Sequence, residues 1–390
     1  MKPRKILDGI YWMGVIDWNR RLFDSLIPLP DGTTYNAYLI KGSEKTVLLD
    51  TVEPELSDTL LEQLSSEDKI DYIISHHAEQ DHSGTIPKLL KLYEKAIVIC
   101  SVKAKDLLIE HINIDPKRIR TVSDGESLSL GDKTLKFIYT PWVHWPETMS
   151  TYLIENRILF SCDFFGSHFA SSELFADNDE TIYKAAKRYY AEIMMPFRKM
   201  IQKNIEVIKT LKIDYIAPSH GPIYNHPASI ISKYEDWIKD GVENKVIIAY
   251  VSMHGSTKNM VDYFISALED RGIRYQLFEL SGDYDIGKLA ISLVDASTIV
   301  IGTPTVNIGP HPNVVNAVYL VNSLRPKLRY SVVIGSYGWS SKAVDQITSI
   351  MSNLKLEIFD PVYCKGQPGN IQYQEIDSLA DKILDKHSKL

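Results

Sequence analysis

The ten-residue stretch SHHAEQDHSG, residues 75–84, decides how the first half of the chain is interpreted. It follows the apolar residues 72–74 and precedes a helix-like run, so the pattern predicts a loop between a buried strand and a helix. The loop carries two imidazoles and two carboxylates: His77, Glu79, Asp81 and His82. Alternate side chains of an extended backbone share a face, so we expect the first three to converge while His82 turns off as the helix begins. Imidazole with carboxylate suits borderline and hard metals, and the stretch predicts ligands for two adjacent metal ions.

The same stretch has a purely structural alternative. Asp81 or Ser83 could cap the helix, with the histidines on a solvated loop. Three later loops bear on the choice, because each follows an apolar strand and holds one His or Asp: His144, Asp163 and His220. Sites are usually built in such loops. A lone His between aromatic residues is more often a core residue, but three such loops together are difficult to explain by packing alone.

The composition is that of an ordinary globular protein with room for a full core. The chain has 390 residues, of which 44% are hydrophobic and 24% charged, and this length suggests two or three domains. A net charge of -7 and the absence of a Lys/Arg run give no support for nucleic acid or an anionic membrane as a partner.

The chain shows no targeting signal and no disulfide pattern. No signal peptide follows the N-terminus, and no apolar run approaches the roughly 20 residues of a membrane span. Cys100, Cys162 and Cys364 lie far apart and form no CxxC pair. We therefore expect a cytoplasmic protein in a reducing compartment.

Strands and helices alternate through the first half of the chain. Apolar runs predict strands at 35–40, 46–50 and 96–100, and two hairpins follow within 127–139 and 151–161. Helical spacing lies between several of these runs. The pattern predicts two sheets covered on the outside by helices, a layered α/β architecture.

The rhythm changes after a linker at 241–245. Residues 246–251 form an almost continuous apolar run, typical of a strand buried on both faces of a parallel sheet. Five strands then alternate with five helices, which predicts a doubly wound sheet of flavodoxin type. We expect domains at 1–243 and 244–390.

Three loops at the strand ends of the second half indicate a flavin site. The loop SMHGSTKN, residues 252–259, is not GxGxxG, but its hydroxyls and backbone N–H groups could hold a phosphate monoester; a polar turn with a capping Ser is the alternative. Two later loops resemble those that enclose the isoalloxazine ring in flavodoxins, with Tyr337 or Trp339 able to stack on it. The predicted FMN-binding residues are Ser252, Met253, His254, Gly255, Ser256, Thr257, Pro304, Thr305, Val306, Asn307, Ser336, Tyr337, Gly338, Trp339 and Ser340.

The seven candidate ligands in this order resemble the ligand series of the metallo-β-lactamase-like fold in its flavodiiron version. Zinc hydrolases of that superfamily place His where this chain has Glu79, and the added carboxylate favours iron or manganese. The resemblance implies a first iron held by His77, Glu79 and His144. It implies a second iron held by Asp81, His82 and His220, with Asp163 bridging the two.

The resemblance also marks residues around the ligands. His76 departs from the family pattern, which often has Asn there, and alternation points it away from the site. Asp50 is similar to a superfamily aspartate that supports the ligand loop without binding metal. His168 and Tyr190 are expected to lie beside the ligands, against the alternatives of a surface histidine and a core tyrosine.

Taken over the whole chain, the sequence is identified as similar to class A flavodiiron proteins, with an αββα unit followed by a flavodoxin-like FMN unit. The resemblance implies reduction of O2 to water and/or of NO to N2O, with FMN relaying electrons to a diiron site. It also implies a head-to-tail homodimer or dimer of dimers, and reduced rubredoxin or coenzyme F420H2 as donor. The alternatives are a zinc hydrolase with an appended flavodoxin unit and a flavin electron carrier without enzymatic activity.

Overall fold

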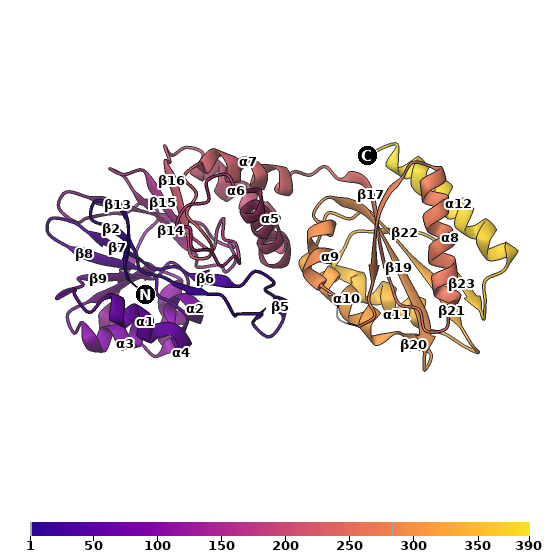
Figure 1. Cartoon of the computed structure of the whole chain (residues 1–390), viewed down its shortest axis with the longest axis horizontal. Coiled ribbons are helices and arrows are strands. Elements are labelled where there is room, and N and C mark those ends of the chain that lie inside the picture. Colours follow the sequence, from indigo (N-terminus) through magenta and orange to yellow (C-terminus); the bar gives the residue numbers. More distant parts are fainter. Residues whose placement is uncertain (1, 283) are drawn as a thin grey trace. The chain divides into compact units, whose positions relative to one another are not determined.

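The structure is a computed structural model that describes residues 2–282 and 284–390. The chain forms two compact units (Figure 1): one runs up to Tyr190 and includes Phe197–Ile238, and the other comprises Ala191–Pro196 and Lys239–Leu390. The domain limits of 1–243 and 244–390 remain our proposal, with β17 beginning at Glu243.

The first unit contains a seven-stranded sheet in the order β1-β2-β7-β8-β9-β10-β11. Its strands are β1 (Arg4–Leu7), β2 (Ile10–Trp12), β7 (Tyr38–Lys41), β8 (Thr46–Leu49), β9 (Tyr72–Ile74), β10 (Ile97–Ser101) and β11 (Ile119–Val122). The helices between these strands are α1 (Ser57–Gln63), α2 (Gln80–Ser83), α3 (Ile86–Leu92) and α4 (Ala104–Ile112). Two short ribbons, β3 (Val15–Asp17) with β6 (Thr33–Tyr35) and β4 (Leu22–Phe23) with β5 (Ile27–Pro28), precede β7.

The second sheet of this unit has five strands in the order β12-β13-β14-β15-β16. They are β12 (Ser127–Ser129), β13 (Thr134–Tyr139), β14 (Met149–Leu153), β15 (Ile158–Cys162) and β16 (Tyr215–Pro218). The later helices of this unit are α5 (Glu180–Tyr189), α6 (Arg198–Ile208) and α7 (Pro227–Ile238). A π-helical segment at Tyr190–Met194 follows α5, and all of it after Tyr190 is assigned to the other unit.

Two apolar cores separate these layers. One core joins alternate residues of the first sheet, such as Leu48 and Ile73, to Leu60 and Leu108 of its helices. The other joins the opposite face of that sheet to the second sheet, for example through Val47 and Phe137. Alternation along the strands therefore sends one set of side chains to the helices and the other between the sheets. The predicted layered sandwich is confirmed.

The second unit is a parallel sheet in the order β18-β17-β19-β21-β22. Its strands are β17 (Glu243–Tyr250), β18 (Arg274–Glu279), β19 (Ala296–Val306), β20 (Gly309–Pro310), β21 (Tyr330–Tyr337), β22 (Glu357–Ile358) and β23 (Val362–Lys365). Its helices are α8 (Ser256–Asp270), α9 (Ile286–Leu293), α10 (Pro312–Leu324), α11 (Ala343–Ile350) and α12 (Asn370–His387).

Both faces of this sheet are buried. Val246 and Ile248 pack with residues of α8 and α12, whereas Ile247 and Ala249 pack with residues of α9 and α10. Burial on both faces explains the near-continuous apolar run of β17, and the predicted doubly wound fold is confirmed.

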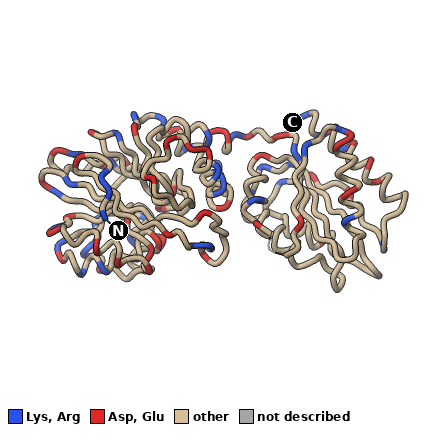
Figure 2. Tube along the Cα trace, viewed as in Figure 1, with Lys and Arg blue, Asp and Glu red and all other residues tan. Residues whose placement is uncertain are grey.

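Charge is distributed over both units. Figure 2 shows Lys and Arg interspersed with Asp and Glu along the trace of each unit. Among the described helices, none is both long and apolar enough to cross a membrane.

A buried histidine ties the last helix to the sheet of the second unit. His387 is 5% exposed, and its Nε2 lies 2.9 Å from Ser297 Oγ and 2.7 Å from Thr298 Oγ1. Its Nδ1 lies 2.7 Å from Asn244 Oδ1. Because Asn244 Oδ1 can only accept, Nδ1 carries the proton and the neutral ring fits this site.

We expect this histidine to make the second unit sensitive to acid. Burial lowers the pKa of His387 to about 4 from the ordinary 6.5. As the pH falls, the unfolded state therefore binds the proton before the folded state does. The contribution of neutral His387 to the free energy of unfolding is present above about pH 6.5 and is lost as the pH falls toward 4. We expect a loss of about 1–2 kcal/mol by pH 5, read as faster amide hydrogen exchange in β17 and α12 of the full chain. His387→Gln should remove this pH dependence and the exposed His226→Gln should keep it; equal pH dependence in both variants would contradict the assignment.

Candidate metal centre and flavin cavity

The sequence-predicted metal ligands lie at strand ends on one side of the first unit. His77 follows β9, Asp163 follows β15 and His220 follows β16. Strands β15 and β16 pair in parallel, and β9 pairs in parallel with β8 and β10. Strand β9 belongs to the first sheet and β15 and β16 to the second, and the loops after these strands bring residues far apart in sequence to a common point. His144 arrives from the loop before β14.

Four side chains form the first of two polar groups. His77, Glu79, His144 and Asp163 each offer one ligand atom, and these atoms lie within 4.8 Å of one another. Glu79 Oε2 is 3.1 Å from His77 Nε2 and 3.0 Å from His144 Nε2. Asp163 Oδ2 is 3.7 Å from His77 Nε2 and 3.6 Å from His144 Nε2.

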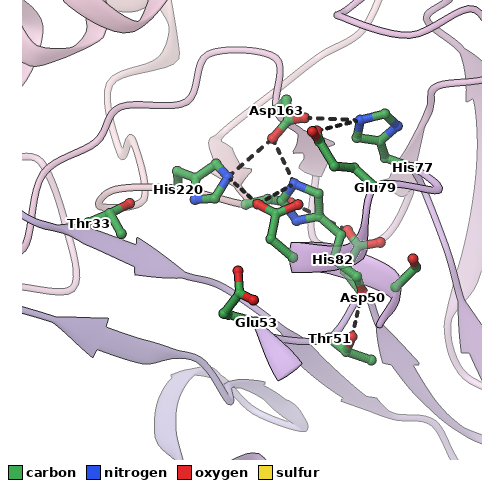
Figure 3. A network of polar contacts seen from close by, with 12 residues as sticks. Thr33, Asp50, Thr51, Glu53, His77, Glu79, His82, Asp163 and His220 are labelled. Atoms are coloured by element: carbon green, nitrogen blue, oxygen red, sulfur yellow. Dashed lines mark hydrogen bonds and ion pairs between the residues drawn. The ribbon is translucent and has the colours of Figure 1, made fainter. Parts of the chain in front are cut away.

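The second group contains Asp81, His82 and His220, again within 4.8 Å. Asp81 Oδ2 is 3.3 Å from His82 Nε2 and 3.2 Å from His220 Nε2. Asp163 Oδ1 is 3.0 Å from His82 Nε2 and 3.5 Å from His220 Nε2. Asp163 therefore turns one oxygen to each group, and Figure 3 shows it between His77 on one side and His220 on the other.

Several polar atoms of this cluster lack the hydrogen bonds that burial normally requires, whereas Glu79 Oε2 is hydrogen-bonded to His77 and His144. Both carboxylate oxygens of Asp81 and Asp163 and both ring nitrogens of His82 are buried without a hydrogen-bond partner. Buried polar atoms left unpaired cost about 1–3 kcal/mol each. Three carboxylates facing four imidazoles form a donor set of the kind that binds two cations, so these residues fit a metal pair.

The protonation equilibria support the same conclusion. Burial alone would lower the pKa of His77, but hydrogen bonds to Glu147 and Glu79 outweigh it and raise the pKa well above its usual value. Burial likewise opposes a charge on His82, yet Asp81 and Asp163 raise the pKa of this ring to about 10. The carboxylates thus attract protons strongly when no other cation is present. Metal ions would have to displace these protons, so we expect weaker metal binding at low pH.

The local backbone differs from the expected extended loop. Glu79 is extended, with φ -61° and ψ 145°, but a one-turn helix α2 begins at Gln80. Asp81 and His82 both come from this helix. The alternating pattern therefore describes only His77 and Glu79, and the helix brings Asp81 and His82 to the second group.

His76 and Asp50 form a support beneath the ligand loop. Asp50 Oδ1 accepts the His76 backbone N–H at 2.8 Å, and Asp50 Oδ2 lies 2.6 Å from His76 Nδ1. His76 Nε2 is 2.7 Å from Thr151 Oγ1. Both ring nitrogens of His76 are thus engaged away from the polar groups, as expected.

Glu147 is a functional candidate that sequence reasoning missed. It is buried, and its Oε1 lies 2.7 Å from His77 Nδ1 and accepts the Ala78 backbone N–H at 3.0 Å. Burial would raise the pKa of Glu147, but the His77 hydrogen bond holds it below its usual value. A carboxylate on the second nitrogen of a ligand His fixes the tautomer and orients the ring. The only sequence signal was its position three residues after His144.

We expect Glu147→Gln to weaken metal binding without abolishing it. The amide can still accept a hydrogen bond but no longer favours the oriented, electron-rich imidazole, so metal affinity should fall about 10–100-fold. Competition with a chelator during metal analysis measures this change. Glu126→Gln, at a partly exposed carboxylate paired with Arg120, is the control. Equal metal retention in both variants would show that Glu147 has no such role.

The structure brings His168 to the cluster but not Tyr190. His168 packs 4.9 Å from the His220 ring, and its Nδ1 lies 2.9 Å from Thr33 Oγ1, whereas its buried Nε2 has no partner. Tyr190 instead packs against Tyr234 and Trp237. The preceding residue, Tyr189, faces the cluster, with ring centroids 4.9 Å from His168 and 5.9 Å from His220.

The second unit holds a cavity of about 230 Å³ at the carboxyl edge of its sheet. Members of all three predicted flavin loops line it: Met253, His254, Ser256, Pro304, Thr305, Ser336, Tyr337 and Gly338. Gly366 and Gln367, after β23, also line it and were not predicted. Trp339 and Ser340 line a separate cavity of about 390 Å³ that Tyr337 also borders.

The remaining predicted residues of the first flavin loop shape the start of α8. Gly255 is the N-cap with φ 87°, a left-handed conformation that favours glycine. Ser252 Oγ accepts the Lys258 backbone N–H, and Thr257 Oγ1 is buried without a partner. An unpaired buried hydroxyl at a helix N-terminus beside a cavity fits a bound phosphate. Val306 ends β19 and pairs with Gly309, and Asn307 lies in the turn to β20.

The fold and the site define a class of protein with two units. The first is metallo-β-lactamase-like and carries the two groups of ligand atoms, and the second is flavodoxin-like. The family described as "ODP family beta lactamase" matches residues 33–221. A nitric oxide reductase of Moorella thermoacetica is 37% identical over 92% of this chain and 91% of its own length. A coenzyme F420H(2) oxidase of Methanothermobacter marburgensis is 33% identical over 91% of each chain.

The solved structure of the rubredoxin oxygen:oxidoreductase from the anaerobe Desulfovibrio gigas superposes with a TM-score of 0.94. It is 30% identical and the match covers 99% of each chain. The chain belongs to the flavodiiron protein family.

Proposed function

We propose that this protein is an oxidoreductase that reduces O2 to water and/or NO to N2O at a diiron site, with electrons relayed through FMN. The observation that carries the proposal is Asp163, which offers one oxygen to each of two adjacent ligand groups. Relatives named as nitric oxide reductase, rubredoxin oxygen:oxidoreductase and F420H2 oxidase support it.

The proposed ligand assignment follows the two groups. His77, Glu79 and His144 would hold one iron, and Asp81, His82 and His220 the other, with Asp163 shared. When bound, the iron pair and FMN would supply the redox chemistry. The chain's own residues orient the ligands: Glu147 holds His77, and the Thr34 carbonyl oxygen lies 2.7 Å from His220 Nδ1. His168 and Tyr189 form the wall beside His220.

The zinc hydrolase alternative is not favoured. Glu79 Oε2 lies 3.1 Å from His77 Nε2 and 3.0 Å from His144 Nε2, so the proposed ligand at this position is a carboxylate oxygen. Three carboxylates in one cluster suit iron better than an imidazole-rich set does. A pure electron carrier is also disfavoured, because every ligand position is filled and the atoms converge.

FMN would bind in the cavity at the carboxyl edge of the second unit. The phosphate would lie at the N-terminus of α8, near Ser256 and Thr257. The ring would lie against the loops of Pro304 and Tyr337, which line the same cavity. The fifteen residues predicted from the sequence remain the proposed set, to which the structure adds Gly366 and Gln367.

A homodimer in which the flavin of one copy serves the irons of the other is part of the proposal, as is a dimer of such dimers. Large apolar side chains are exposed on both units, including Trp18, Leu26, Met253 and Trp339. Such side chains are buried at stable interfaces. A cytoplasmic location is also proposed, and the unpaired cysteines Cys100, Cys162 and Cys364 support it.

The donor is proposed to be coenzyme F420H2 or reduced rubredoxin. Stopped-flow mixing of anaerobic protein with each donor would measure flavin reduction, and subsequent mixing with O2 or NO would measure reoxidation. We expect rapid reduction by one of the two donors and rapid reoxidation by at least one gas. Slow reoxidation by both gases in protein loaded with iron and FMN would overturn the proposed activity.

A further inference from the structure

A series of polar side chains lies near the second ligand group, outside the seven ligand positions. Arg20 precedes β4, Tyr35 ends β6, and Glu53 precedes the 3-10 helix Pro54–Leu56. Figure 3 shows the Glu53 carboxylate directed toward the group that contains His82 and His220. None of these side chains has a role in the ligand set described above.

Exposure falls steadily along this series. The Glu55 side chain is 76% exposed and its Oε2 lies 3.3 Å from Arg20 Nη1. Arg20 is 28% exposed and its Nη2 lies 4.0 Å from Oε2 of Glu53, which is 18% exposed. Asp81, at the inner end, is 4% exposed. The series therefore runs from the exposed Glu55 to the buried Asp81, and we call it the polar path.

Two buried donors on this path have no partner. Arg20 Nε and the Tyr35 hydroxyl are both buried and make no hydrogen bond. The Tyr35 ring packs edge-on 5.6 Å from the His220 ring. Burial raises the pKa of Tyr35, so its hydroxyl keeps the proton. Unpaired buried donors beside carboxylates are satisfied by ordered water, which can also carry protons.

The proposed reaction needs protons at the metal pair. Reduction of one O2 to two waters takes four electrons and four protons, and reduction of two NO to N2O and water takes two of each. The electrons would come from the external donor through FMN, and the protons would come from solvent. His77 and His220 are poorly placed to carry protons from solvent. The Nδ1 atom of His77 is engaged by Glu147 and that of His220 by the Thr34 carbonyl, and the Nε2 atom of each ring faces the cluster.

We propose that Glu53, which is paired with Arg20 and directed toward the ligand cluster, delivers these protons to the metal pair; the inference rests on the proposed function. Each proton passes from solvent to the Glu53 carboxylate and on to the reduced oxygen product, and Glu53 is then protonated again from solvent.

The electrostatic surroundings of Glu53 suit this role. Its charged neighbours are Asp81 and His82 of the cluster, Arg20 of the N-terminal segment and Glu55 next in sequence. Burial, followed by repulsion from Asp81, raises the pKa of Glu53 above its usual value, although Arg20 opposes this shift. A carboxyl whose neutral form is favoured in this way can donate a proton as a general acid.

The test compares Glu53→Gln with Asp58→Asn, a control at a 96% exposed carboxylate, in full-length protein loaded with iron and FMN. We expect Glu53→Gln to keep metal, flavin and the rate of flavin reduction, while gas reduction falls about 100-fold and loses its alkaline limb. Formate added to Glu53→Ala should restore part of the rate. Infrared titration of the metal-free protein should show a protonated carboxyl above the usual Glu range that Glu53→Gln lacks.

Unchanged turnover and pH profile in Glu53→Gln would overturn the inference, as would an infrared titration identical to that of the unmodified protein. If Glu53→Gln loses metal, Glu53→Asp decides: a lower rate that formate restores supports delivery by Glu53, and a full rate contradicts it. Failure of the proposed function can be told apart from failure of the Glu53 inference, because the unmodified protein itself would then reduce neither gas.

Discussion

Asp163→Ala is expected to release both metal ions and to abolish gas reduction. Asp163 Oδ1 and Oδ2 face different ligand groups, so one substitution removes a ligand from each. It also leaves the like-charged imidazoles of His82 and His77 without the carboxylate between them. A metal pair supplies several kcal/mol of catalysis, and we expect turnover to fall about 1,000-fold or more. Metal analysis with gas-consumption assays measures both effects.

The control for Asp163→Ala is Asp214→Ala, which removes a 47% exposed carboxylate paired with Arg157 in the same unit. It should keep full metal content and turnover. Retention of both metal ions by Asp163→Ala would show that this carboxylate is not shared.

Glu79→His is expected to change the preferred metal of the first ligand group from iron to zinc, without abolishing metal binding. The substitution replaces the oxygen that lies near 3 Å from both His77 and His144 with an imidazole. The first group would then be richer in nitrogen and would favour zinc over iron. Because zinc has no redox chemistry, we expect oxidase activity to fall about 100-fold or more even when the site is full.

Glu79→Asp separates the change of ligand chemistry from a loss of packing. The shorter carboxylate keeps the oxygen ligand, so iron should still exceed zinc and part of the activity should survive. The proposed role of Glu79 would be wrong if Glu79→His kept iron and turned over O2 or NO as fast as the unmodified protein.

The sequence predicted which stretches meet, because His77, Asp163 and His220 each follow an apolar strand, in the loops where sites are usually built. The sequence could not predict the role of Glu147. A single Glu after Trp145 and Pro146 belongs to no periodic pattern, and its role depends on its contact with His77, which only the fold establishes. The ligand roles themselves remain proposals.

The choice between Tyr189 and Tyr190 shows a second limit. Adjacent residues of a helix point in directions about 100° apart, so a shift of one position changes the face completely. Only the packing where α5 passes into the π-helical segment, with Tyr189 against His168 and Tyr190 against Trp237, decides which ring meets the cluster.

The flavin cavity shows a third limit. The apolar run at 356–359 predicts one terminal strand, but the structure has β22 at Glu357–Ile358 and a second strand, β23, at Val362–Lys365. Because β23 pairs with β21, its end lies beside the Tyr337 loop. Gly366 and Gln367 reach the cavity for this reason, which the local pattern alone did not reveal.

Metal and flavin content of protein purified without air tests the central claim most directly. We expect about two iron ions and one FMN per chain, because two ligand groups share Asp163 and a cavity lined by members of all three predicted flavin loops lies in the second unit. A chain that bound zinc in both groups, or one that bound no flavin, would contradict the account.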